Sequence, residues 1–116
     1  MSPENEKILK EKYPVILENM GTPYYGSIDV GDGWSGIIDK LCLQLSETPE
    51  PIKATQIKEK FGTLRFYTDV STDQQDKFIT SAENESAIVC EVCGRPGKIR
   101  SSGRSWIKTL CDEHNN

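Results

Sequence analysis

Apolar residues between positions 33 and 47 recur at steps of three and four, which is the spacing of one face of an α-helix. The residues on this stripe are Trp34, Ile37, Ile38, Leu41, Cys42 and Leu45. Asp32 precedes the stripe as a candidate helix cap, and Pro49 and Pro51 forbid its continuation. The pattern predicts a helix over 33–47 that buries its apolar face, with Cys42 as a small apolar side chain of the core.

Between residues 52 and 70 the pattern changes to the alternation of a half-buried strand. Two extended segments flank Gly62, and a glycine at this point supplies the positive φ of a tight turn. The pattern therefore predicts an antiparallel hairpin over 52–70. Its second strand is expected to bury Leu64, Phe66 and Val70 and to expose Arg65, Tyr67 and Asp69.

The amino-terminal part of the chain begins with a helix signal. Ser2 is a candidate cap, and Pro3 occupies the first helical position, where its missing N–H is not needed. These residues predict a helix over 3–12, which Pro14 ends because it removes a backbone donor. A short turn is expected after Pro14. The glycine-rich stretch 22–33 is expected to be loop or short extended structure.

A third helix is indicated after the hairpin. Thr72 followed by Gln75 forms a capping box, which predicts a helix over 73–86. This segment has few apolar residues, so the helix is expected on the surface. Together these elements predict an α+β body over 1–89, with helices packed on a small antiparallel β-sheet.

The remaining chemistry lies in two paired motifs near the carboxyl terminus. Cys90-x-x-Cys93 is followed after 17 residues by Cys111-x-x-His114, which uses three of the four cysteines and the one histidine. Cys₃His is a standard closed ligand set for tetrahedral Zn²⁺. A disulfide with a stray thiol, a redox Cys-x-x-Cys motif and an iron–sulfur site are the competing interpretations. A redox motif does not explain the matched Cys-x-x-His downstream, and the sequence favours one structural Zn²⁺ over all three alternatives.

The residues between the two ligand pairs have the pattern of a hairpin. Candidate strands at 98–100 and 106–110 flank a polar turn. A knuckle, a hairpin and a ligand pair that opens a short terminal helix describe a treble-clef-like finger over 90–116, in which the helix is only a stub. All four ligand positions are filled by the protein, so the ion has no open position for an activated water.

Composition and charge narrow the classes of function. The chain has 116 residues, which fits one domain with a small appendage, and 35% of them are apolar. It has no apolar run of the ~18 residues that a membrane span needs, and the charged start MSPENEKILKEK is not a secretory signal. We therefore expect a cytoplasmic protein with no membrane partner.

The acidic and basic residues are unevenly distributed. Residues 1–89 carry 15 acids and 9 bases, whereas residues 90–116 carry 3 acids and 5 bases. The five bases form an uninterrupted stripe between the ligand pairs: Arg95, Lys98, Arg100, Arg104 and Lys108. Such a stripe suits phosphates or an acidic partner, or it keeps the finger hairpin solvated.

Four segments resemble a family of small, functionally uncharacterised zinc-finger proteins of bacterial, phage and prophage genomes. They are GDGWSGIIDKLC at 31–42, IKEKFGTLRFY at 57–67, CEVCGRPG at 90–97 and SWIKTLCDEH at 105–114. The resemblance implies a zinc-binding α+β protein and a mobile-element setting. The resemblance implies no established activity. Small phage proteins of this kind often inhibit or decoy host defence machinery, and from that setting we expect a host protein as partner.

The residues themselves favour binding over catalysis. General acid–base catalysis at neutral pH usually uses histidine, and His114 is committed to the metal. The chain also lacks the lysine-containing glycine loop that cradles phosphates. We therefore predict a non-enzymatic binding protein. Residue types that anchor protein interfaces are Tyr24, Tyr25, Trp34, Arg104 and Trp106, although Trp34 also fits the core.

Two other ligand classes stay open. Arg65 and Tyr67 share one strand face, and Lys58 and Lys60 lie on the facing strand, so this face suits a small nucleotide signal. The finger hairpin, with Arg100 and Arg104, is the candidate surface for nucleic acid. An acidic body disfavours that third alternative.

Overall fold

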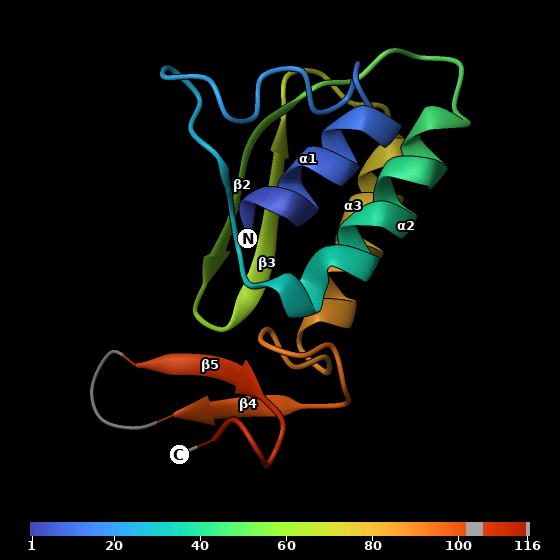
Figure 1. Ribbon diagram of the computed structural model, residues 1–116. Helices are drawn as coiled ribbons and strands as arrows, with labels where there is room; N and C mark the ends of the chain where they lie inside the picture. The colour runs from blue at the N-terminus through green and yellow to red at the C-terminus, as the bar shows by residue number, and fades with distance from the viewer. Residues whose placement is uncertain (102–105, 116) are drawn as a thin grey trace.

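In the described residues, 1–101 and 106–115 of a computed structural model, three helices gather on one side of a three-stranded sheet and a two-stranded hairpin follows (Figure 1). The helices are α1 (Pro3–Lys12), α2 (Ser35–Ser46) and α3 (Asp73–Ser86), and the 3-10 helix η1 (Asp32–Trp34) precedes α2. The strands are β1 (Ile28–Asp29), β2 (Ala54–Lys60), β3 (Thr63–Thr68), β4 (Lys98–Ser101) and β5 (Ile107–Leu110). The α+β class predicted from the sequence is confirmed.

The hairpin β2–β3 turns through two residues in left-handed conformation. Phe61 has φ of +54° and Gly62 has φ of +84°. Two-residue hairpin turns favour positive φ values because the twist of such a turn matches the twist of the two strands. Leu64 and Phe66 are buried, as expected. Val70 is 75% exposed, so its predicted burial is wrong; β3 ends at Thr68, and the chain has already left the sheet when it reaches Val70.

The sheet is mixed rather than purely antiparallel. Strand β1 pairs in parallel with β2, with Ile28 opposite Ile57 and Asp29 opposite Lys58. The sequence predicted only loop or short extended structure here, because a two-residue strand gives no periodic signal. Its pairing depends on residues almost thirty positions away.

Asp32 does not cap α2, contrary to the sequence prediction. The 3-10 turn η1 lies between Asp32 and the helix, and the Asp32 Oδ1 instead accepts a hydrogen bond from the Ser2 backbone N–H at 2.8 Å. This hydrogen bond is the main reason why the pKa of Asp32 lies below its usual range. Ser2 itself caps α1, since its Oγ accepts from the Asn5 backbone N–H, as predicted.

Helix α3 begins with the predicted capping box but is not merely a surface helix. It packs on β3 and on α2, and Gln75, Ile79, Ala82 and Ser86 are buried. Ser86 Oγ accepts from the Leu64 N–H at 2.8 Å, and Glu83 Oε2 accepts from the Phe66 N–H at 3.0 Å. These polar residues cover the outer edge of β3, which explains why a helix with few apolar positions packs there.

The opposite edge of the sheet is covered in the same way. The Ile28 N–H donates to Glu6 Oε1 at 2.6 Å, and the Ile28 carbonyl accepts from the amino terminus at 3.2 Å. Glu6 of α1 and the amino terminus therefore satisfy the outer backbone groups of Ile28 in β1. Since both edges are capped by side chains or the terminus, the sheet offers its edges poorly to a further strand.

Between the helices and the sheet lies one hydrophobic core. Its fully buried large side chains include Leu17, Met20, Ile28, Trp34, Ile38, Leu41, Ile57 and Leu64. Cys42 is fully buried among them, as predicted, and burial together with nearby Asp39 raises its pKa to about 12. This cysteine is therefore an inert apolar side chain.

We expect Gln75→Ala to lower the free energy of unfolding by about 2–3 kcal/mol. The buried Gln75 amide donates to Thr48 Oγ1 and to the Glu50 carbonyl, both at 2.9 Å, and accepts from the Thr72 N–H at 2.9 Å. Alanine leaves these groups unpaired in the interior. Urea unfolding measures the loss. Gln74→Ala, at an exposed position in the same turn, is the control and is expected to change stability by no more than about 0.5 kcal/mol.

Candidate metal centre

The first two ligands lie on a tight knuckle that follows α3. The Gly94 N–H donates to the Cys90 carbonyl at 2.9 Å, and Gly94 has φ of +81°, a conformation that glycine adopts without strain. The second two ligands follow β5. Cys111 and His114 are the first and last residues of one turn, in which the His114 N–H donates to the Cys111 carbonyl at 3.3 Å. The structure has this turn where the sequence predicted a short stub of helix.

The four side chains converge on one point. Cys93 Sγ lies 3.7 Å from Cys111 Sγ, and His114 Nδ1 lies 3.7 Å from Cys90 Sγ and 3.1 Å from Cys111 Sγ. All four candidate ligand atoms lie within 4.8 Å of one another. Tetrahedral Zn²⁺ at ordinary bond lengths would place such atoms roughly 3.5–3.8 Å apart. The residues therefore fit a single tetrahedral ion, which the histidine would bind through Nδ1.

The surroundings favour the thiolate form that a metal needs. Burial opposes ionisation of Cys90, but the backbone N–H groups of Cys111, Cys93 and Val92 lower the pKa of this thiol to about 6. Burial opposes ionisation of Cys111 too, but its hydrogen bond with His114 lowers its pKa, and the same hydrogen bond raises the pKa of His114. Cys90 and Cys111 are thus favoured as thiolates, whereas the pKa of Cys93 is raised, because the hydrogen bond from the Arg95 N–H is outweighed by burial and by the neighbours Cys111 and Cys90.

Acidification is expected to weaken metal binding. The folded-state pKa of Cys90 is depressed, so its ionisation favours the folded site above the ordinary thiol pKa and this contribution is lost as the pH falls through about 6. Competition with a chromogenic chelator at pH 7.5 and at pH 5.5 would measure the change. An apparent affinity that is equal at the two pH values would contradict this account.

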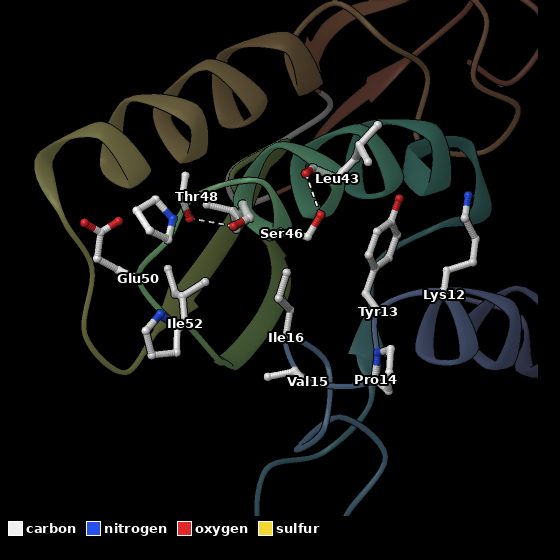
Figure 2. A pocket seen from close by; sticks show the side chains of 13 residues that line it. Lys12, Tyr13, Pro14, Val15, Ile16, Leu43, Ser46, Thr48, Glu50 and Ile52 are labelled. Atoms are coloured by element: carbon white, nitrogen blue, oxygen red, sulfur yellow. Dashed lines mark hydrogen bonds between the residues drawn. The ribbon is translucent and has the colours of Figure 1, made fainter.

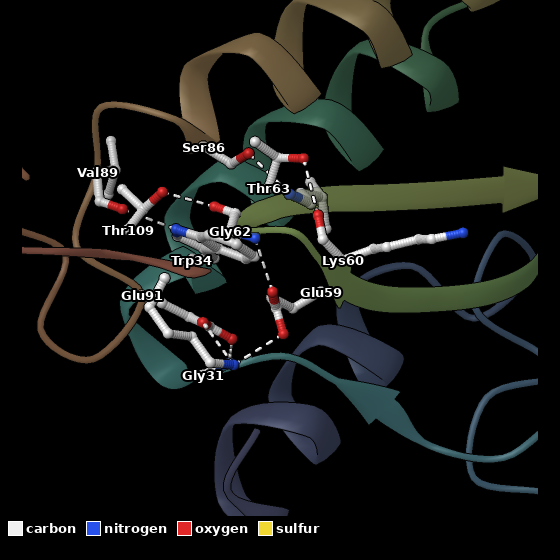
Figure 3. Close-up of polar contacts among 12 residues, drawn as sticks. Gly31, Trp34, Glu59, Lys60, Gly62, Thr63, Ser86, Val89, Glu91 and Thr109 are labelled. Carbon is white, nitrogen blue, oxygen red and sulfur yellow. Dashed lines mark hydrogen bonds and ion pairs between the residues drawn. The ribbon is translucent and has the colours of Figure 1, made fainter. Parts of the chain in front are cut away.

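The segment with the four candidate ligands is joined to the body by several hydrogen bonds (Figure 3). The Trp34 indole N–H donates to the Val89 carbonyl at 2.8 Å. The Gly33 N–H donates to the Glu91 carbonyl at 2.8 Å, and the Gly31 N–H donates to Glu91 Oε2 at 3.0 Å. The loop before α2 therefore holds the backbone of the first knuckle.

The tip of the β2–β3 hairpin forms the other half of this joint (Figure 3). Thr109 Oγ1 donates to the Gly62 carbonyl at 2.5 Å. Glu59 links both sides, because its carboxylate accepts from the Gly62 N–H at 2.8 Å and pairs with Lys108 Nζ at 2.7 Å. The predicted body, 1–89, and the predicted finger, 90–116, therefore contact each other closely.

Glu91 is the residue of this joint that sequence reasoning missed. It lies inside the Cys-x-x-Cys knuckle, is 9% exposed, and has Lys108 Nζ at 3.9 Å. Burial raises its pKa, although the Gly31 N–H and Lys108 oppose this. The available signal was the pair of glycines before Trp34. A side chain at Gly31 or Gly33 would collide with the Glu91 backbone.

Three of the five bases in the stripe of the finger pair with acids, whereas Lys98 has no carboxylate partner among the described residues. Arg95 pairs with Glu113 at 3.1 Å, and Arg100 pairs with Asp112 at 2.7 Å. Lys108 is engaged by Glu59 in the joint. Arg104 lies outside the described residues. Pairing leaves less free charge on this hairpin than the sequence alone suggested.

The candidate ligand residues of the hairpin do come together. Lys58 faces Arg65 across the β2–β3 ladder, Lys60 faces Thr63, and Lys58 Nζ lies 5.8 Å from the centre of the Tyr67 ring. These side chains are on the face of the sheet opposite the helices, which we call the open sheet face: Gln56, Lys58, Lys60, Thr63, Arg65 and Tyr67. Trp106, a candidate from the finger, is 39% exposed and directly precedes β5.

A separate groove of about 510 Å³ lies between the turn after α1 and the end of α2 (Figure 2). Its walls are mostly apolar and include Val15, Ile16, Leu43 and Ile52, and Leu43 is half exposed. At its rim Tyr13 donates to Asp39 at 2.5 Å. The groove carries no cluster of ligating or nucleophilic groups.

Comparisons with known proteins assign this chain to no family, so its class is defined by the fold and by the geometry of the candidate site. No family model, no curated protein and no solved structure matches the chain. Among the described residues, no helix combines the length and the apolar character needed to cross a bilayer. What the fold and the site define is an α+β protein with a carboxyl-terminal Cys₃His group that can hold one metal ion.

Proposed function

We propose that this chain is a non-enzymatic, zinc-stabilised binding protein that docks a protein partner on its open sheet face. The observation that carries the proposal is the exposure of Tyr67 beside Lys58 and Arg65 on a sheet whose two edges are capped. Tyrosine and arginine are the residue types that dominate interface energies. The partner would contact side chains of this face rather than add a strand.

In this proposal the ion is Zn²⁺ and its role is structural. Three thiolates and one imidazole from the chain complete a tetrahedral set, so no ligand position is left for a reacting water. Such coordination contributes about 10–16 kcal/mol in small zinc modules. The joint through Trp34, Glu59 and Glu91 would pass that stability on to the body.

We propose a bacterial host protein as the partner, with a component of its defence machinery as the first candidate. The support is the resemblance of the segments at 31–42, 57–67, 90–97 and 105–114 to phage and prophage proteins.

A small nucleotide is the second candidate ligand. The supporting observation is a shallow hollow of about 500 Å³ at the end of the open sheet face, lined by Tyr24, Tyr25, Thr55, Gln56, Lys58 and Tyr67. Tyrosine rings suit a base and the ammonium group suits a phosphate. A rise in melting temperature with a nucleotide, absent in Tyr67→Ala, would support this candidate, and no rise across a nucleotide panel would remove it.

Affinity capture from host lysate with three forms of the chain tests the protein-binding proposal. Tyr67→Ala alters the open sheet face, and Leu43→Ala alters the apolar groove of Figure 2. We expect a stoichiometric partner with the wild type and with Leu43→Ala, and its loss with Tyr67→Ala. Capture of nothing by the folded wild type would overturn the proposal, and so would a partner lost only with Leu43→Ala.

A further inference from the structure

Three cations of the open sheet face lie close together without acidic partners. Elsewhere in the described residues, six bases pair with carboxylates, among them Lys12, Lys40 and Lys53, whereas Lys7, Lys10, Lys77 and Lys98 have no such partner. Within the described part of the chain, Lys58, Lys60 and Arg65 have no carboxylate oxygen within 4.0 Å. They occupy neighbouring positions on paired strands, so their positive charges add.

This arrangement costs stability in the isolated chain. Lys58 and Arg65 are direct cross-strand neighbours, and like charges in that position repel. The Nε of Arg65 is covered and meets no acceptor in the described part of the chain, although buried donors are ordinarily satisfied. A partner cannot reach the covered Nε, but the terminal Nη groups of Arg65 form no ion pair in the described part of the chain, so they can bind a carboxylate as a two-pronged fork.

Aromatic side chains border the cations. Tyr67 is 43% exposed and already carries Lys58 on its ring, and Tyr24 and Tyr25 pack edge to face at 5.0 Å beside the hollow. Rigid aromatic rings provide contact area at low cost in conformational entropy. The face therefore combines apolar anchors with unpaired positive charge.

The charge of the rest of the molecule limits what can bind there. The net charge is −4, and Asp29 lies in register beside Lys58, so the positive area is short. A long polyanion such as nucleic acid would extend onto acidic surface and be repelled. The finger offers little continuation, since Arg95 and Arg100 are paired. A short acidic stretch of a protein fits this area better.

We infer that the open sheet face recognises an acidic segment of its protein partner, with Lys58, Lys60 and Arg65 binding carboxylates and Tyr67 packing against an adjacent side chain. This inference rests on the proposed function and adds the chemistry of the partner. Because the sheet edges are capped by Glu6, Glu83 and Ser86, the recognition uses side chains.

Titrations of the ¹⁵N-labelled, metal-loaded chain with three probes test the inference. The probes are the peptide Glu-Glu-Tyr-Glu-Glu, its counterpart Gln-Gln-Tyr-Gln-Gln, and a single-stranded oligothymidylate. The oligonucleotide has about twelve nucleotides, a length within the range that one small single-strand-binding domain covers. We expect amide shifts centred on Lys58, Arg65 and Tyr67 with the glutamate peptide. Its affinity should exceed that of the glutamine peptide by about 10-fold and fall with added salt.

The double variant Lys58→Ala/Arg65→Ala should lose this preference, whereas Lys77→Ala, an exposed lysine on α3, should keep it. Equal shifts with both peptides, no shifts with either, or tighter binding of the oligonucleotide at the same residues would overturn the inference. If affinity capture finds a partner that is lost in Tyr67→Ala, but the chain shows no preference for the glutamate peptide, the proposed function stands and only this inference is removed.

Discussion

Replacing Cys90 by serine is expected to weaken metal binding and to destabilise the whole chain. Four ligands share about 10–16 kcal/mol in small zinc modules, so the loss of one is expected to weaken binding by roughly 3 kcal/mol, on the order of 100-fold. Cys90 is the fully buried ligand, and its sulfur accepts backbone N–H groups from both ligand pairs. Elemental analysis and the cobalt spectrum of the purified chain measure stoichiometry and tetrahedral geometry.

Cys42→Ala is the matched control, because Cys42 is a buried thiol in the core and away from the metal centre. This variant is expected to retain one equivalent of metal despite some loss of core packing. Chelation of the wild type should lower its melting temperature, since Trp34 and Glu59 would lose their ordered partners in the finger. A purified chain that contains no metal and melts identically with and without chelator would contradict the structural role of the ion.

Replacing Gly33 by alanine is expected to lower the free energy of unfolding by about 3 kcal/mol. A Cβ at this position would lie 2.1 Å from the Cys90 carbonyl oxygen and 2.6 Å from the Glu91 carbonyl carbon. Both atoms belong to backbone that the metal-ligand knuckle fixes, so neither can move away easily. Thermal or urea unfolding of the metal-loaded chain measures the loss, which we expect to be accompanied by weaker metal binding.

Gly36→Ala provides the comparison within the same segment. A Cβ at Gly36 meets nothing within 4 Å, and the residue lies in α2, where alanine is favoured over glycine by up to about 1 kcal/mol. We expect this variant to be as stable as the wild type or slightly more stable. If the two alanine variants unfold alike, the close approach of Gly33 to the knuckle does not govern the joint.

Elements with local signals were predictable from the sequence. The capping residues Ser2 and Thr72 start α1 and α3 where expected, because a cap acts within one helical turn. The turn at Gly62 and the apolar stripe of α2 were equally local. The ligand set was predictable too, since Cys-x-x-Cys and Cys-x-x-His each need only one turn to bring their pair together.

Interactions between distant segments gave no such signal. Asp32 is of the residue type that caps helices, but in the folded chain η1 separates it from α2 and its carboxylate accepts the Ser2 N–H instead. Helix α3 seemed too polar to pack, yet Glu83 and Ser86 are needed by the free N–H groups of β3. Such side-chain partners are determined by the backbone groups that sheet pairing leaves without a hydrogen bond. The periodicity of apolar residues does not indicate which groups these are.

Local sequence patterns predicted the three helices, the caps at Ser2 and Thr72, the hairpin turn and the four residues that can hold a metal. Each of these depends on neighbours within a few positions, or on the chemistry of one side chain. Two features became visible in the folded structure alone. The backbone of Gly31 and Gly33 packs closely against Glu91 in the first ligand knuckle. The side chains of Lys58, Lys60 and Arg65 lie together on one sheet face without carboxylate partners among the residues that the structure describes. The reason is physical: steric contact and charge pairing depend on distance in space, which the chain order leaves open until the core has packed.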